Sequence, residues 1–166
     1  MRPMEGSFEE YVQARGPALL RLAFLLCSDR HLAEDLTQDV LIRVYRQWRR
    51  ISGLGHPDAY VKRMLVNEHL SWRRRRSNGE LPTAEMSSPA EQGDAADTVV
   101  RRHAAVHLLA GLPKRQRAVL VLRFYEDLTD QQIAEVLRCS PATVRSQASR
   151  ALATLRTSRG LTRQDV

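Results

Sequence analysis

The sequence predicts an all-α protein made of two small helical domains that are joined by a flexible acidic linker. Apolar residues recur at intervals of three and four, and the alternation typical of β-strands is absent. The 166 residues carry a net charge of +7, but the charge is uneven along the chain. Residues 1–76 carry +5 and residues 101–166 carry +7, whereas residues 77–100 carry −5. Each basic segment is about the size of the smallest domains that fold alone.

The acidic segment, SNGELPTAEMSSPAEQGDAADTVV, separates the two basic domains. It holds no arginine or lysine, few apolar residues, and many Ser, Pro, Gly, Ala and Asp residues. Such a composition cannot bury enough apolar surface to offset the entropy of ordering. We therefore expect residues 1–76 and 101–166 to form domains and residues 77–100 to form a flexible linker.

Hydrophobic periodicity places four helices in each domain. The expected ranges are 7–14, 17–28, 31–50, 58–76, 97–110, 114–125, 129–137 and 141–157. In the third helix the expected core face holds Ala33, Leu36, Val40, Leu41, Val44, Tyr45 and Trp48. The opposite stripe holds Asp35, Gln38, Asp39, Ile42 and Arg46. This stripe is either a solvated outer face or, because Ile42 lies among carboxylates, a contact surface for a basic partner helix.

The fourth helix carries polar residues that suit nucleic acid. Tyr60, Arg63 and Asn67 lie on one helical face, and the helix then runs into Arg73, Arg74, Arg75 and Arg76. Arginines bind phosphates, while aromatic and amide side chains suit unpaired bases. The alternatives are a solvated basic helix end that the helix dipole favours, and a core position for the neighbouring Trp72.

The second domain contains the pattern of a helix-turn-helix. Thr129 and Gln132 form a capping box, and Ser140 followed by Pro141 begins the second helix. The second helix presents short polar and arginine side chains that suit base edges and phosphates in a major groove: Thr143, Arg145, Ser146, Gln147, Ser149 and Arg150. The alternative is an ordinary helical hairpin with a polar outer face.

The sequence offers no catalytic group, metal site or cofactor motif that can be defended. His103 and His107 have a spacing that could hold zinc, but no third ligand pattern accompanies them. Two isolated cysteines fit a reduced, cytoplasmic compartment. The longest apolar run is too short to cross a bilayer and follows acidic residues, so neither a membrane segment nor a signal peptide is expected.

Three motifs in order resemble the extracytoplasmic-function (group four) sigma factors of bacterial RNA polymerase, and most closely their actinobacterial SigE-like subgroup. HLAEDLTQDVLIRVYRQW is similar to the family's core-polymerase-binding helix. HPDAYVKRMLVNEHLSWRRRR is similar to its promoter-melting and minus-ten-reading segment, and residues 1–76 as a whole are similar to sigma region 2. LAGLPKRQRAVLVLRFYEDLTDQQIAEVLRCSPATVRSQASRALATLR is similar to its minus-thirty-five-reading domain, sigma region 4.

The resemblance implies a non-enzymatic transcription initiation factor that directs core polymerase to promoters and helps to open DNA. Asp35, Gln38, Asp39 and Ile42 would grip the clamp coiled coil of the largest subunit. Tyr60, Arg63 and Asn67, with the loop before them, would hold an unpaired minus-ten base, and Arg73–Arg76 would follow the backbone. The helix-turn-helix would lie on the flap of the second-largest subunit and on duplex DNA. An anti-sigma factor is a further candidate partner.

Two residues depart from the family pattern. Arg138 stands in the helix-turn-helix turn where the family usually has glycine, and a left-handed conformation there would cost about 1–2 kcal/mol. Ser71 stands where the family often has an acid. Two other functions remain open from the sequence: a stand-alone helix-turn-helix regulator and, more distantly, a metal hydrolase that uses His103 and His107.

Overall fold

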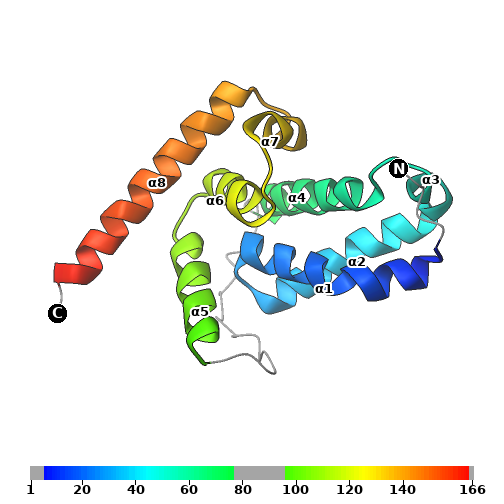
Figure 1. Ribbon diagram of the computed structural model, residues 1–166, viewed down its shortest axis with the longest axis horizontal. Helices are drawn as coiled ribbons and strands as arrows, with labels where there is room; N and C mark the ends of the chain where they lie inside the picture. Colours follow the sequence, from blue (N-terminus) through cyan, green and yellow to red (C-terminus); the bar gives the residue numbers. More distant parts are fainter. Residues whose placement is uncertain (1–5, 77–95, 165–166) are drawn as a thin grey trace. The chain divides into compact units, whose positions relative to one another are not determined.

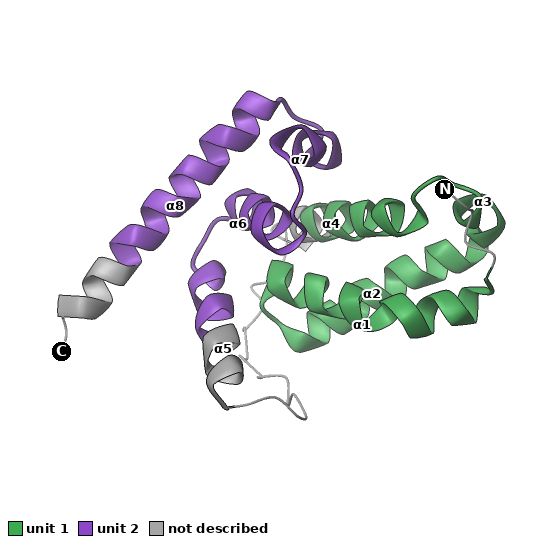
Figure 2. Cartoon of the chain, in the orientation of Figure 1, with its two compact units in different colours: residues 1–86 green, residues 87–166 purple. Residues whose placement is uncertain are grey.

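The computed structural model describes residues 6–76 and 96–164, and describes side chains for residues 6–71 and 103–158. Its regular elements within these ranges are all helical (Figure 1). The chain divides into two compact units, Met1–Met86 and Ser87–Val166 (Figure 2). The predicted all-α class with two helical domains is therefore confirmed. The proposed limits of the linker remain a prediction, because residues 77–95 lie outside the described part.

The first unit is built on three long helices. Its elements are α1 (Phe8–Cys27), α2 (Arg30–Arg46), α3 (Trp48–Ser52) and α4 (Pro57–Arg76). Helices α1, α2 and α4 pack against one another in all three pairings. Ser7 and Asp29 cap α1 and α2 by accepting hydrogen bonds from backbone N–H groups three residues later. The fully buried core side chains include Tyr11, Leu19, Leu22, Leu26, Ala33, Leu36, Val40, Val44, Ile51, Val61, Leu65 and Val66.

Helix α1 corrects the expectation of two helices divided near Pro17. The structure has one helix of 20 residues with Pro17 inside it. A proline removes one helical hydrogen bond and crowds the preceding turn. However, Tyr11 before it and Leu19 and Leu22 after it are buried on one side of the helix, while Pro17 itself is exposed. Burial of this continuous apolar face keeps the two segments in one helix.

The expected helix 31–50 is instead two helices, because the chain leaves helical geometry at Gln47, where φ is −116° and ψ is 16°. The break turns Trp48 toward the start of α1. Its indole Nε1 donates to the carbonyl of Gly6 at 3.3 Å, and its ring lies 5.2 Å from the ring of Tyr11. Aromatic packing against the first turn of α1 therefore fixes the direction of α3.

The second unit ends in a helical hairpin. Its elements are α5 (Ala96–Ala110), α6 (Lys114–Leu120), the π-helical turn η1 (Val121–Tyr125), α7 (Asp130–Leu137) and α8 (Pro141–Gln164). Helix α8 packs against α6 and α7. The buried side chains of the second unit include Leu112, Ala118, Val119, Leu120, Val121, Leu122, Ile133, Ala134, Leu137, Val144, Ala148 and Ala151. The expected helix 114–125 is thus an α-helix followed by one π-helical turn.

Two polar features shape the ends of these helices. The buried guanidinium of Arg117 donates to the carbonyls of Ala110 and Leu112 at 3.2 and 3.0 Å, which fixes the turn between α5 and α6. Near the other end of the unit, α8 extends well beyond the range expected for it. The hydroxyls of Thr154, Thr157 and Ser158 there each donate to the backbone carbonyl four residues earlier.

Candidate functional site

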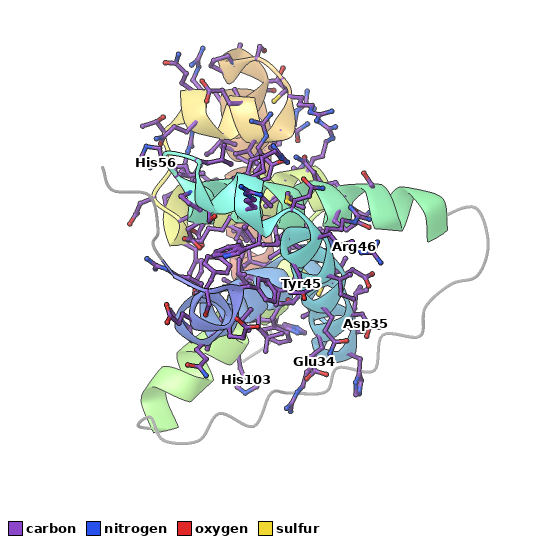
Figure 3. The ribbon with its side chains drawn as sticks, turned by 90° about the vertical axis from the view of Figure 1, so that its right-hand side faces the viewer. Glu34, Asp35, Tyr45, Arg46, His56 and His103 are labelled. Atoms are coloured by element: carbon purple, nitrogen blue, oxygen red, sulfur yellow. The ribbon has the colours of Figure 1, made fainter. Side chains whose placement is uncertain are left out.

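A polar face on α2, which we call the α2 face, comprises Asp35, Gln38, Asp39 and Ile42. All four side chains are exposed, whereas Leu36, Thr37 and Val40 between them are buried. Ile42 is 51% exposed although it is a large apolar residue. Helix α2 thus presents an isoleucine among carboxylates outward, in the arrangement that the sequence indicated. Figure 3 shows Asp35 and Arg46 toward opposite ends of this helix.

Tyr45 was wrongly assigned to the core from its periodicity. It is 62% exposed, and its helical angle lies close to that of Gln38. Its ring packs edge to face with that of Phe8 of α1, with the ring centroids 5.1 Å apart. Tyr45 therefore extends the α2 face with an anchored aromatic side chain. The signal that could have found it is the seven-residue spacing from Gln38, which is nearly two full turns.

A second face, which we call the α4 face, comprises Tyr60, Arg63 and Asn67. All three side chains are partly exposed, while Val61, Leu65, Val66, Glu68 and His69 are buried on the other side of α4. Neither Arg63 nor Asn67 makes a hydrogen bond or ion pair with another described residue. The α4 face therefore brings together an aromatic ring, a guanidinium and an amide, and the latter two have no side-chain partner among the described residues.

Tyr60 is held by a residue that the sequence did not single out. Nη2 of Arg50, on α3, donates to the Tyr60 hydroxyl at 2.9 Å. The same guanidinium lies over the Tyr60 ring, 5.4 Å from its centroid, and also donates to the side chain of Gln47. The short helix α3 and the loop at residues 53–56 thereby support the start of the α4 face.

Two polar contacts fix α4 within the unit. The Tyr11 hydroxyl donates to Asp58 at 3.1 Å, and Arg43 of α2 pairs with Glu68 at 2.8 Å. Burial, followed by the negative charge of Asp58, raises the pKa of the Tyr11 hydroxyl and keeps it protonated as a donor. These contacts hold the helix that carries Tyr60, Arg63 and Asn67 against α1 and α2.

The arginine run continues the same helix, since α4 reaches Arg76. The side chains of Arg73, Arg74, Arg75 and Arg76, together with that of Trp72, lie outside the residues whose side chains are described. The backbone places the run on the last turns of α4. Its predicted contact with a DNA backbone therefore remains a prediction, as does the choice between core and base-stacking roles for Trp72.

The predicted helix-turn-helix geometry is present in the second unit. Thr129 accepts from the Gln132 N–H at 3.2 Å, and the Gln132 side chain accepts from the Thr129 N–H at 2.9 Å, which completes the capping box. Ser140 accepts from the Thr143 N–H at 3.1 Å and caps α8. Between the helices, Arg138 has φ 55° and ψ 51°, the left-handed conformation that an L-residue adopts at a cost.

The first turns of α8 present the predicted recognition residues to solvent. Val144, Ala148 and Ala151 are buried, as expected. The side chains that the sequence assigned to DNA are exposed, except that of Gln147, which is partly exposed: Thr143, Arg145, Ser146, Ser149 and Arg150. Leu152 and Leu155, expected in the buried stripe, are only partly buried.

The histidine pair does not gain further metal ligands. His103 and His107 are both exposed on α5, and across the described residues no three His, Cys, Asp or Glu side chains gather as a metal site would require. None of the helices within residues 6–76 and 96–164 combines the length and apolar character of a membrane span.

Two family descriptions match the chain, and together they cover more than half of it. "Sigma-70 region 2" matches residues 11–79, and "Sigma-70, region 4" matches residues 102–155. The first match includes the α2 and α4 faces. The second includes the helix-turn-helix. The two motif sets that the sequence analysis treated separately therefore fall into two regions of one family.

Named relatives agree with these matches. The chain is 39% identical over 150 residues to the RNA polymerase sigma-E factor of Streptomyces coelicolor, which covers 90% of this chain and 84% of that protein. It is 38% identical over 149 residues to the sigma-E factor of Streptomyces avermitilis, covering 90% and 83%. The ECF RNA polymerase sigma factor SigE of Mycolicibacterium smegmatis is 31% identical over 156 residues, covering 90% and 60%.

A solved structure shares the fold. The sigma factor RpoE of Bartonella quintana, in complex with the anti-sigma factor NepR, matches with a TM-score of 0.70 and 25% identity over 90% of this chain and 94% of that one. The stand-alone regulator is not favoured, because region 2 is present beside the helix-turn-helix. The chain belongs to the sigma-70 family of RNA polymerase sigma factors, in its extracytoplasmic-function class, and is a transcription initiation factor.

Proposed function

We propose that this factor binds core RNA polymerase through the α2 face, captures unpaired promoter DNA on the α4 face, and reads upstream duplex DNA with the first turns of α8. The observation that carries the proposal is the α2 face itself. Asp35, Asp39 and Ile42 are exposed on a helix whose other side is fully buried. A basic partner helix would use both the charge of Asp35 and Asp39 and the apolar contact of Ile42, which lies about one turn beyond Asp39, whereas a solvated face requires neither.

The partner of the α2 face is the clamp coiled coil of the largest polymerase subunit. Carboxylates of Asp35 and Asp39 suit its basic side chains, and Ile42 with Tyr45 supplies the apolar centre. A contact of this kind becomes strong when its centre is desolvated and its rim is complementary in charge. The exposed aromatic ring of Tyr45, which packs edge to face with Phe8, enlarges that centre.

DNA contacts fall on both units. Tyr60, Arg63 and Asn67 suit a minus-ten base that has left the stack, because an aromatic ring and an amide read a base that is no longer paired. Arg73–Arg76 suit the adjacent phosphates. Arg145 and Arg150 suit an intact major groove, where the exposed first turns of a recognition helix reach base edges and phosphates.

The chemistry of transcription belongs to the polymerase, and the factor acts in the cytoplasm with it as a non-enzymatic subunit. The second unit also lies on the flap of the second-largest subunit. A similar sigma factor was solved with an anti-sigma factor bound, and an anti-sigma factor is accordingly a third partner in this proposal.

Run-off transcription with purified core polymerase on a library of promoter fragments tests the proposal. The full chain should convert core polymerase, which initiates poorly on duplex DNA, into an enzyme that transcribes a subset of fragments with a shared upstream and minus-ten sequence. The matched control is the same chain with both Asp35 and Asp39 changed to arginine. Sequence-specific duplex binding at nanomolar concentration by the chain alone, without any gain from core polymerase, would contradict the proposal and favour a stand-alone regulator.

A further inference from the structure

The contact between Arg50 and Tyr60 joins two different helices, so helical periodicity in the sequence cannot predict it. Arg50 lies on the five-residue helix α3, and Tyr60 lies in the first turn of α4. The guanidinium both donates to the phenol oxygen at 2.9 Å and lies over the ring at 5.4 Å. Because one contact fixes the end of the ring and the other fixes one of its faces, the side chain of Tyr60 is restricted in both rotation and tilt.

The base of this arrangement is rigid. Ile51, the residue after Arg50, is fully buried, and the N–H groups of Arg50 and Ile51 both donate to the carbonyl of Gln47. The Gln47 side chain also accepts from Arg50, so both described hydrogen bonds of the guanidinium come from Nη2. Arg50 is thereby aligned from its own helix and does not depend on Tyr60 for its position.

We infer that Arg50 is a positioning residue for base capture: it holds the Tyr60 ring so that the uncovered face of the ring accepts an unpaired base of the promoter. This inference rests on the proposed function of the α4 face and adds a residue outside α4 to it. A ring that is held before the base arrives loses less entropy on binding than a free ring does. The positive charge on the covered face also draws electron density from the ring that the base then stacks on.

The competing role for Arg50 is a direct phosphate contact. Its Nε and Nη1 groups make no hydrogen bond with another described residue, and the side chain is exposed. A phosphate contact would act independently of Tyr60, and it would add to the salt dependence of DNA binding. A positioning role would act only through Tyr60 and would leave the salt dependence nearly unchanged. The two roles therefore differ in measurable ways.

The test is a double-mutant cycle in the full holoenzyme, with Arg50→Ala, Tyr60→Ala and the double variant. The measurement is the rate of open-complex formation from permanganate reactivity of unpaired thymines, at several salt concentrations. The matched control is Arg49→Ala, which removes an exposed arginine that lies on the same helix and does not contact Tyr60. Thermal unfolding of each variant checks that the first unit stays folded.

Arg50→Ala should slow opening by about 3- to 10-fold, which is part of the roughly 1–3 kcal/mol that one base–aromatic stack contributes. When Tyr60 is already alanine, Arg50→Ala should slow opening by less than about 2-fold further. The control Arg49→Ala should slow opening by less than about 2-fold both in the wild-type protein and in the Tyr60→Ala variant. If the fold-changes in opening rate of Arg50→Ala and Tyr60→Ala multiply in the double variant, the inference is overturned in favour of a phosphate contact. A weaker dependence of opening on salt concentration in Arg50→Ala would have the same meaning. If Tyr60→Ala opens DNA normally, both the inference and the proposed role of the α4 face are overturned. If Tyr60→Ala opens DNA slowly but Arg50→Ala opens it normally, only the inference is overturned.

Discussion

The guanidinium of Arg43 on α2 pairs with the carboxylate of Glu68 on α4 at 2.8 Å, and the two side chains are unequally exposed. Arg43 is 48% exposed, but the Glu68 side chain is only 9% exposed. The cost of breaking the pair therefore depends on which partner is left behind. An arginine that loses its carboxylate remains solvated, whereas a carboxylate that loses its arginine stays largely buried.

Arg43→Ala should lower the free energy of unfolding of the first unit by about 1–2 kcal/mol, because it leaves a buried carboxylate without its partner. Arg30→Ala is the control, since it removes an exposed pair with Glu34 and should change stability by less than about 0.5 kcal/mol. Urea unfolding followed by tryptophan fluorescence isolates this unit, since both tryptophans of the chain, Trp48 and Trp72, lie in it. Equal losses in the two variants would contradict the prediction.

Reversing charge on the α2 face should abolish polymerase binding without unfolding the protein. Asp35→Arg combined with Asp39→Arg should weaken binding to core polymerase by about 100-fold or more, because like charges across an interface cost several kcal/mol. Both residues are exposed, so the helical content should not change. Co-purification with core polymerase measures the effect. Glu9→Arg combined with Glu135→Arg makes the same change in net charge at exposed sites off this face, and it should co-purify at the wild-type yield.

Removing polar groups from the α4 face should impair DNA opening while it spares closed-complex formation. Arg63→Ala with Asn67→Ala removes groups that suit a base only after it leaves the stack. Permanganate reactivity of unpaired thymines should fall by about 10-fold or more, and a template with a pre-melted minus-ten bubble should recover part of the loss. Gln13→Ala with Arg15→Ala, an exposed amide and guanidinium on α1, is the matched control. Normal opening by the α4 variant would show that this face has been assigned wrongly.

Recognition of the upstream duplex should depend on the first turns of α8. Arg145→Ala with Arg150→Ala should weaken holoenzyme binding to duplex promoters, by about 1–3 kcal/mol for each base contact that is lost. Arg115→Ala with Arg156→Ala removes the same charge from exposed positions elsewhere in the unit. Footprinting on a duplex promoter distinguishes the pairs. The helix-turn-helix assignment fails if both pairs weaken binding to the same extent.

The turn of the helix-turn-helix should gain stability from glycine. Arg138→Gly relieves a left-handed conformation that costs an L-residue about 1–2 kcal/mol. Glycine also gives the unfolded chain more conformational freedom, which offsets part of that gain, so the free energy of unfolding should rise by about 0.5–1 kcal/mol. Hydrogen exchange of the α7 and α8 amides should slow by about two- to five-fold. Arg145→Gly, at an exposed position inside α8, is the control and should accelerate exchange. Faster exchange in Arg138→Gly would show that the arginine side chain itself stabilises the turn.

Much of the fold follows from local rules that the sequence states directly. Capping residues and three-to-four periodicity locate α7 and the start of α8, and periodicity locates the start of α2, because each of those signals acts within a few residues. The exposed positions of the α2 face and the recognition helix follow from the same periodicity. In each case the helix angle of a polar residue decides its exposure once the buried side is known.

The structure departs from the sequence predictions for different reasons: distant packing overrides a local signal at Pro17, whereas the helical angle of Tyr45 already excluded it from the core. Pro17 indicates a helix break, yet buried residues on both sides keep α1 continuous. Tyr45 is aromatic and adjacent to buried Val44, but its helical angle places it outside, against Phe8. Arg50 could not be found at all, because its contact with Tyr60 depends on the turn at Gln47 and on the loop between α3 and α4.

Helix α8 is 24 residues long, and among its described side chains, up to Ser158, the last fully buried one is that of Ala151. From Leu152 to Ser158 the side chains are only partly buried or exposed, so tertiary packing contributes less to the order of this segment and the helix–coil equilibrium contributes more. A segment of this length is marginally helical in water, and the hydroxyl groups of Thr154, Thr157 and Ser158 bond to carbonyls that water could otherwise reach. The end of α8 should therefore lengthen on cooling and shorten on warming over a broad range, well below the temperature at which the core of the unit melts cooperatively.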